Sequence, residues 1–155
     1  MRYAIRPSDL TYNLSACPRC LWLNYQHDVK IPMAMPLVGE LADIQESFYE
    51  VRPPEAIDSM FQGAQVLSRN EWVTSQTISH RGSETKFHIN GKYDLLIKMQ
   101  DSRYAVVDCK FSSKARDHMD FYLPQLEAYA YCLEHPQSGE SFEVSTVGRL
   151  AWTTN

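Results

Sequence analysis

The residues with the clearest chemical potential are two aspartates and a lysine on neighbouring predicted strands. Asp94 lies in a strand that ends before residues 99–103, and Asp108 and Lys110 lie in the strand that follows. A symmetric connection centred on Asp101 pairs residues whose numbers sum to 202, which places Asp94 opposite Asp108 with Cβ atoms about 5 Å apart. Because side chains alternate along a strand, Lys110 projects from the same face as Asp108.

Two carboxylates this close repel each other, and the residue types alone leave two explanations. Either the pair is exposed and screened by Lys98 and Lys110, or it is retained to bind a cation. Two carboxylates, a backbone carbonyl and water suit Mg²⁺ or Mn²⁺. Such an ion acidifies water and polarises a phosphoryl oxygen, while a lysine orients the attacking hydroxide and stabilises developing charge. This chemistry predicts a phosphodiester substrate.

The sequence around these residues predicts antiparallel strands that position them. In residues 87–97, Asn90 and Gly91 favour the tight type I′ turn of a hairpin. Residues 104–110 are rich in β-branched and aromatic residues, and only a short loop separates them from the hairpin. We therefore expect a second antiparallel pairing there.

Helices are predicted mainly in the first third of the chain. Ser8-Asp9 can cap a short helix over residues 10–14, and Pro18 can start a second helix. Residues 37–51 predict an amphipathic helix, and residues 55–63 allow one or two further helical turns. The apolar face of the amphipathic helix consists of Leu37, Leu41, Ile44 and Phe48.

The last part of the chain predicts one more helix and one more strand. Pro124 suits a first helical turn, after which Leu126, Ala130 and Leu133 share a face, and residues 142–152 are typical of a strand. The predicted order is α-α-α-β-β-β-α-β. The sequence thus predicts an α/β layer fold with a mixed sheet.

Composition restricts the class of protein. The chain has 155 residues and 44% hydrophobic residues, which predicts a single globular domain over residues 1–155 without disulfide staples. Apolar runs stay short of the ~20 residues that span a bilayer, and the first residues lack the features of a secretory signal, so we expect a cytoplasmic protein with reduced thiols. The net charge is -4, but residues 81–116 carry eight basic and four acidic residues. Any phosphate-binding surface is expected in that segment.

Several groups of residues resemble, in order and spacing, the motifs of the PD-(D/E)XK nuclease superfamily. They are Gly91-Lys92-Tyr93-Asp94, Asp108-Cys109-Lys110 and Gln125-Leu126-Glu127-Ala128-Tyr129. More narrowly, G-x-x-D, (D/E)-x-K and Q-x-x-x-Y resemble the RecB-type branch, which includes the exonucleases of CRISPR adaptation, and residues 7–23 resemble its opening helices. The resemblance implies a restriction-endonuclease-like core, a mixed central β-sheet flanked by helices.

The resemblance also implies roles for individual residues in the reaction. Lys110 would be the catalytic lysine, acting beside Asp94 and Asp108. Gln125 and Tyr129, one helical turn apart, would lie beside the scissile phosphate. Taken without the other motifs, that last pair would equally suit the polar edge of a half-buried helix.

The implied metal site includes one departure from the branch. Asp94, Asp108 and the backbone carbonyl of Cys109 would bind the ion. The branch normally adds a histidine from an early G-x-x-x-H helix, whereas this chain has Asp43 four residues after Gly39. Either Asp43 replaces the histidine as an oxygen ligand for a hard cation, or it is a solvated helix residue and the site has decayed.

The cysteines do not complete a known metal site. Some members of the branch bind an iron-sulfur cluster through one early and three late cysteines; Cys17 fits the early position, but after the lysine motif only Cys132 remains, so no cluster is expected. Cys17 and Cys20 have zinc-like spacing without two further ligands. Cys109 and Cys132 are expected to be buried thiols.

Together these residues predict a Mg²⁺- or Mn²⁺-dependent DNA nuclease that hydrolyses phosphodiesters by in-line attack of water. DNA as the substrate comes from the resemblance alone. The alternative is a catalytically inactive nuclease-fold module that binds nucleic acid or a partner protein, which Asp43 keeps open. A third expectation is that the chain works with proteins of a recombination, phage or CRISPR system, away from membranes.

Overall fold

The structure of the protein is a computed structural model, and it describes residues 2–29, 38–111, 119–145 and 149–153. The helices of this part are α1 (Tyr12–Ala16), α2 (Pro18–His27), α3 (Val38–Glu50) and α4 (Met119–Glu134). The strands are β1 (Arg2–Ile5), β2 (Gln65–Arg69), β3 (Trp72–Thr74), β4 (Ile78–Ser79), β5 (Lys86–Lys92), β6 (Leu95–Lys98), β7 (Tyr104–Phe111) and β8 (Arg149–Thr153). Short 3-10 helices cover Pro7–Leu10, Pro54–Ala56 and Ser59–Phe61.

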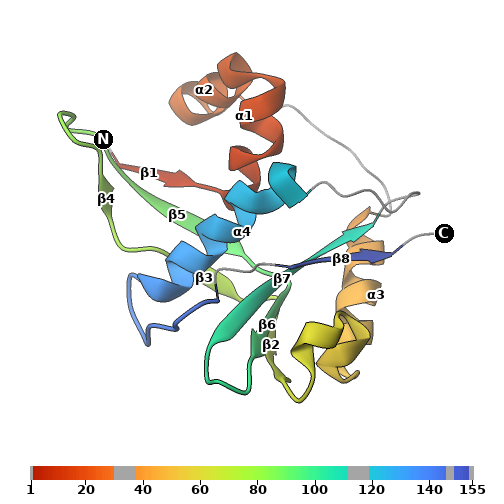
Figure 1. Cartoon of the computed structure of the whole chain (residues 1–155). Coiled ribbons are helices and arrows are strands. Elements are labelled where there is room, and N and C mark those ends of the chain that lie inside the picture. The colour runs from red at the N-terminus through yellow and green to blue at the C-terminus, as the bar shows by residue number, and fades with distance from the viewer. Residues whose placement is uncertain (1, 30–37, 112–118, 146–148, 154–155) are drawn as a thin grey trace.

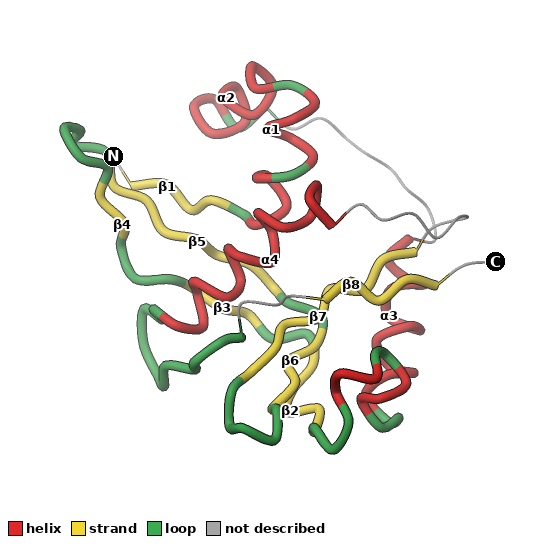
Figure 2. The backbone as a smooth tube through the Cα atoms, in the orientation of Figure 1, coloured by secondary structure: helices red, strands yellow, loops and turns green. Residues whose placement is uncertain are grey.

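The strands form two sheets, and the chain passes between them more than once. The first sheet has the order β1-β5-β3, with β4 also paired to β5, and the second has the order β2-β6-β7-β8. Pairings β1·β5 and β7·β8 are parallel and the others are antiparallel. The chain passes from the second sheet to the first between β2 and β3 and returns between β5 and β6, and α4 lies across both sheets (Figures 1 and 2). The predicted α/β class with mixed strand pairing is confirmed.

The predicted register between β6 and β7 is also confirmed. Leu95 pairs with Val107 and Lys98 pairs with Tyr104, so the residue numbers of each pair have the predicted sum. The short connection tightens this hairpin: the backbone N–H of Met99 donates a 2.7 Å hydrogen bond to the carbonyl of Arg103. Asp94 and Asp108 therefore meet at the end of the ladder.

The predicted turn at Asn90-Gly91 is wrong. Both residues lie inside β5 and pair with Thr74 and Val73 of β3. Gly91 is needed for packing, since a Cβ there would lie 2.6 Å from Cδ of Pro7 and 3.0 Å from Cε1 of Tyr129. The chain turns later, at Tyr93 and Asp94, because β5 pairs with β3 up to its last residue, Lys92.

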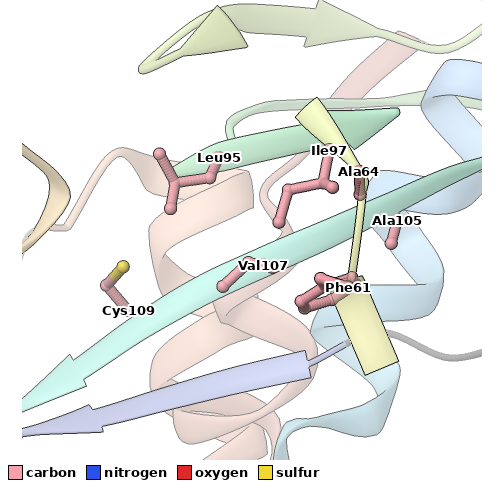
Figure 3. Packing of buried hydrophobic residues seen from close by; sticks show 7 residues of the cluster. All are labelled: Phe61, Ala64, Leu95, Ile97, Ala105, Val107 and Cys109. Carbon is pink, nitrogen blue, oxygen red and sulfur yellow. The ribbon is translucent and has the colours of Figure 1, made fainter. Parts of the chain in front are cut away.

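Both faces of the second sheet are covered, as the alternation along β6 and β7 requires. One face buries a cluster of Phe61, Ala64, Leu95, Ile97, Ala105, Val107 and Cys109 (Figure 3). The other face buries Tyr93, Leu96, Val106, Leu126, Tyr129, Leu133 and Val144, with the last helix packed above it. Leu126 and Leu133 thus occupy the buried face of α4 as predicted, although α4 begins at Met119 and Pro124 lies inside it.

Helix α3 has the predicted extent, but the prediction of its buried face is wrong. Ile44 and Phe48 are 66% and 46% exposed, whereas Gln45 and Glu46 are buried. Tyr49 packs on the first hydrophobic cluster. The spacing of apolar residues predicts the wrong face for burial, because this helix buries polar side chains. Leu37 lies outside the described residues.

The four cysteines divide into two kinds. Cys109 and Cys132 are buried free thiols, as predicted. Cys17 and Cys20 are joined by a disulfide, with Cα atoms 5.2 Å apart, so the expectation that all thiols stay reduced is wrong for this pair. Pro18 starts α2 directly after Cys17, and the first helical turn brings Cys20 back beside it.

Among the described helices, none has both the length and the apolar character needed to cross a bilayer.

Candidate active site

The predicted residues gather where the chain leaves β5 and enters β6. Strand β7 runs beside this junction, α4 covers one face of it, and α3 contacts β7 from the other side (Figure 1). Asp94 belongs to the junction, Asp108 and Lys110 to β7, and Gln125 to α4. The site therefore draws its side chains from three elements that are far apart in sequence.

Asp108 is held at the centre by two polar neighbours. Its carboxylate is buried, and Oδ1 accepts a 2.9 Å hydrogen bond from Nε2 of Gln125. Oδ2 forms an ion pair with the ammonium group of Lys110, and this ammonium group lies 5.1 Å from the ring centroid of Tyr122. Burial raises the pKa of Asp108, and Lys110 opposes that rise. Because Asp108 is only 2% exposed, the structure does not support an exposed, salt-screened pair.

Asp94 is held by backbone contacts. Its Oδ2 accepts a 2.6 Å hydrogen bond from the backbone N–H of Cys109, and its carbonyl accepts one of 3.0 Å from the backbone N–H of Asn70. Burial, followed by the charge of Asp108, raises the pKa of Asp94 to about 7, and Glu46 adds to this rise. An acid whose ionised form is destabilised by partial burial and by neighbouring acids binds a cation favourably, because the cation stabilises the ionised form.

Glu46 is the acidic residue of this region that the sequence reasoning missed. Its carboxylate is buried on α3 and accepts a hydrogen bond from the side-chain amide of Asn70. Burial raises the pKa of Glu46, and Asp43 adds to this effect, while Lys92 and Arg69 oppose it. The spacing Asp43, Glu46, Glu50 marks one acidic stripe of the helix, a signal that could have indicated it.

Asp43 itself is exposed on α3, one helical turn before Glu46. The structure thus brings Asp94 and Asp108 together and directs Glu46 towards them, while Asp43 remains at the outer end of the stripe. Its role as a replacement for a histidine ligand stays a prediction, as does the role of the Cys109 carbonyl.

Gln125 and Tyr129 share a buried face of α4, but they contact different groups. Gln125 contacts Asp108, whereas the hydroxyl of Tyr129 donates a 2.8 Å hydrogen bond to the carbonyl of Lys92. Burial raises the pKa of Tyr129, so it stays a neutral donor. Here Tyr129 fixes the end of β5 immediately before Asp94; contact with a phosphate stays a prediction for both residues.

The donor set suits a hard divalent cation with few protein ligands. Within the described ranges, no cluster of three or more His, Cys, Asp or Glu side chains is close enough to hold a metal. Two carboxylates, Asp94 and Asp108, plus a main-chain carbonyl fit the way Mg²⁺ binds, with water completing its shell. The raised pKa values of both acids agree with this, because a cation would offset the burial of both carboxylates and the repulsion that Asp108 exerts on Asp94.

Comparison with known proteins identifies the family of the chain. A family model described as the PD-(D/E)XK nuclease superfamily matches residues 37–154, a range that contains all the acids discussed above. A solved structure titled "Crystal structure of SSO0001" is similar at 17% identity with a TM-score of 0.46, over 83% of this chain and 55% of that chain, so this chain spans about half of its length. No curated protein matches the chain.

Proposed function

Because the chain belongs to the PD-(D/E)XK nuclease superfamily, we propose that it is a metal-dependent DNA nuclease. The observation that carries the proposal is the pair of half-buried Asp94 and buried Asp108, with the ammonium group of Lys110 on Asp108. Two carboxylates with a single ammonium group leave a net negative charge, which is costly to bury without a further cation. This cost favours a functional reason for keeping the three residues together.

Each residue has a distinct task in the proposed reaction. A divalent ion held by Asp94, Asp108 and the carbonyl of Cys109 would supply Lewis acidity and lower the pKa of a bound water. Lys110 would donate hydrogen bonds to the attacking water and to the phosphate, whose negative charge grows during in-line attack. Gln125 would hold the Asp108 carboxylate in one orientation.

The finer placement in the RecB-type branch is part of the proposal. It rests on the motif residues Asp94, Asp108, Lys110, Gln125 and Tyr129, all of which lie around one junction. Exonuclease action, a cytoplasmic location and partners from a recombination, phage or CRISPR system belong to the same proposal and depend on that branch.

The test is a cleavage assay with linear and circular DNA in Mg²⁺, in Mn²⁺ and in chelator. We expect cleavage only with metal, and a loss of about 10²- to 10³-fold in rate for Lys110→Ala, with Asp108→Ala at least as impaired. Lys98→Ala is the matched control, because Lys98 is exposed at the other end of β6. Cleavage by wild type that survives chelation, or equal cleavage by Asp108→Ala, would contradict the proposal.

The alternative function is an inactive module that binds nucleic acid or a protein through the same fold. It is favoured by the exposed position of Asp43, which lies where the branch has a histidine ligand. In that case wild type and both site variants would leave DNA equally intact while binding it to the same extent. The same assay, followed by a binding measurement, separates the two functions.

A further inference from the structure

One face of the first sheet is open beside the candidate active site and carries Trp72 and Lys92. These residues pair directly across β3 and β5, so their side chains project from the same face. The opposite face is covered: Val73 packs against the buried clusters under α4, and Gly91 lies against Pro7 and Tyr129. The face with Trp72 and Lys92, here called the Trp72–Lys92 face, therefore points away from α4.

This face combines an aromatic surface with a positive charge. Trp72 is 69% exposed, and Lys92 is exposed as well. Tryptophan usually buries most of its large ring, so an indole that remains in water needs a reason. An exposed ring beside a lysine is the combination with which proteins hold a nucleic acid strand, the base on the ring and the phosphate on the ammonium group.

The Trp72–Lys92 face is continuous with the acids of the site. Lys92 precedes Asp94 by two residues, so their Cα atoms lie at most about 7 Å apart. Trp72 follows Asn70 by two residues, and the backbone N–H of Asn70 donates a 3.0 Å hydrogen bond to the carbonyl of Asp94. A strand cleaved at the acids would thus reach the indole with its neighbouring nucleotide.

We propose that the Trp72–Lys92 face binds the nucleotide next to the scissile phosphodiester of a single DNA strand, with the base stacked on Trp72 and its phosphate on Lys92. In a duplex both faces of an internal base are already covered by its neighbours, so an indole can stack only on an unpaired base or a strand end. The proposal rests on the proposed nuclease function for the position of the cut, but it predicts binding that can be measured without cleavage.

The test is binding of short oligothymidylate, followed by tryptophan fluorescence and by fluorescence anisotropy of a labelled strand, in Ca²⁺ and in chelator. Trp72→Ala is expected to weaken binding by about 10- to 100-fold, and Trp72→Phe to retain most of it. Lys92→Gln is expected to lower the slope of log affinity against log salt by about 1. Trp22→Ala is the matched control, because Trp22 is 55% exposed on α2, outside this face.

The outcomes separate this proposal from the proposed function. Unchanged oligothymidylate affinity in both Trp72→Ala and Trp72→Phe, or an equal loss for a closed circular duplex, overturns the Trp72–Lys92 face as a single-strand site even if Asp108→Ala abolishes cleavage. Weakened single-strand binding in Trp72→Ala supports it even if no metal allows cleavage, in which case the nuclease function alone has failed. Circular dichroism of each variant confirms that it is folded.

Discussion

The side-chain amide of Gln125 donates a 2.9 Å hydrogen bond to Oδ1 of Asp108, and both groups are buried. The donor comes from the middle of α4 and the acceptor from the middle of β7, so this bond connects the helix layer to the proposed metal ligand. A carboxylate with one oxygen fixed in this way has little freedom to rotate. The affinity for metal should therefore depend on a residue that itself binds no ion.

Replacement of Gln125 by leucine is expected to weaken Mn²⁺ binding by about 10- to 100-fold, because Asp108 loses the donor that orients it. Isothermal titration of the purified chain with Mn²⁺ measures this directly. Glu127→Ala, an exposed change two residues further along the same helix, should leave the affinity unchanged. Equal affinities for Gln125→Leu and wild type would show that the hydrogen bond does not position the carboxylate.

The metal-free protein should lose stability as the pH rises towards neutrality. The pKa of Asp94 is about 7 in the folded chain and 3.8 as its ordinary value, so between these values the folded state binds more protons than the unfolded state. The free energy of unfolding then falls with increasing pH over that window, and the raised pKa of Asp108 acts in the same direction.

Urea unfolding in chelator at several pH values between about 5 and 8 tests this linkage. Relative to Asp94→Asn, wild type should be progressively less stable up to about pH 7, and the two curves should run parallel above it. Saturating Mg²⁺ should flatten the difference, because the cation replaces the proton. A wild-type curve parallel to that of Asp94→Asn throughout would refute the raised pKa.

Asn70 contacts Asp94 through its backbone and Glu46 through its side chain, and the two contacts should be separable by mutation. It has a left-handed backbone with φ of 57°, which asparagine tolerates better than most residues. Its side chain donates to Glu46 and its backbone N–H to Asp94. Asn70→Gly keeps the backbone and deletes the amide, so the pKa of Glu46 should rise, since the Asn70 hydrogen bond holds it down.

We expect Asn70→Gly to shift the pH profile of cleavage to higher pH with little loss of stability. Asn70→Ala should be about 1 kcal/mol less stable than Asn70→Gly, because alanine resists the left-handed conformation. Urea unfolding and the pH profile together separate the two effects. If both variants showed the wild-type profile, the amide would have no influence on the site.

Gly91→Ala is expected to destabilise the fold by about 1–3 kcal/mol, since the added methyl group would collide with the Pro7 ring and force backbone shifts. Urea unfolding measures the loss, with Thr85→Ala as the control in the exposed loop before β5. A stability within about 0.5 kcal/mol of wild type would mean that Pro7 can move aside at little cost.

The sequence predicts the structure correctly where the local pattern and the tertiary structure agree. The short loop around Asp101 sets the register of β6 and β7, and this register alone brings Asp94 to Asp108. The prediction from sequence is wrong at Asn90 and Gly91, where pairing with β3 and packing on Pro7 override a strong local turn signal.

Helix α3 shows a second reason for failure. Counting apolar residues selects the face of Ile44 and Phe48, but the helix buries Gln45 and Glu46. Its inner surface meets the polar candidate site as well as the hydrophobic cluster that Tyr49 contacts. Strands β1 and β2 were missed for a simpler reason: each is short, and each is defined by its partner in another part of the chain.

The parallel pairing of β1 with β5 means that the fold depends on residues that lie before the range matched by the family model. Residues Arg2–Ile5 and Pro7 precede the matched range of 37–154, yet they flank and cover the strand that delivers Asp94. A chain trimmed to the matched range would leave one edge of β5 without its partner strand and Gly91 without its cover. We therefore expect the smallest unit that keeps Asp94 and Asp108 in place to be larger than the range matched by the family model.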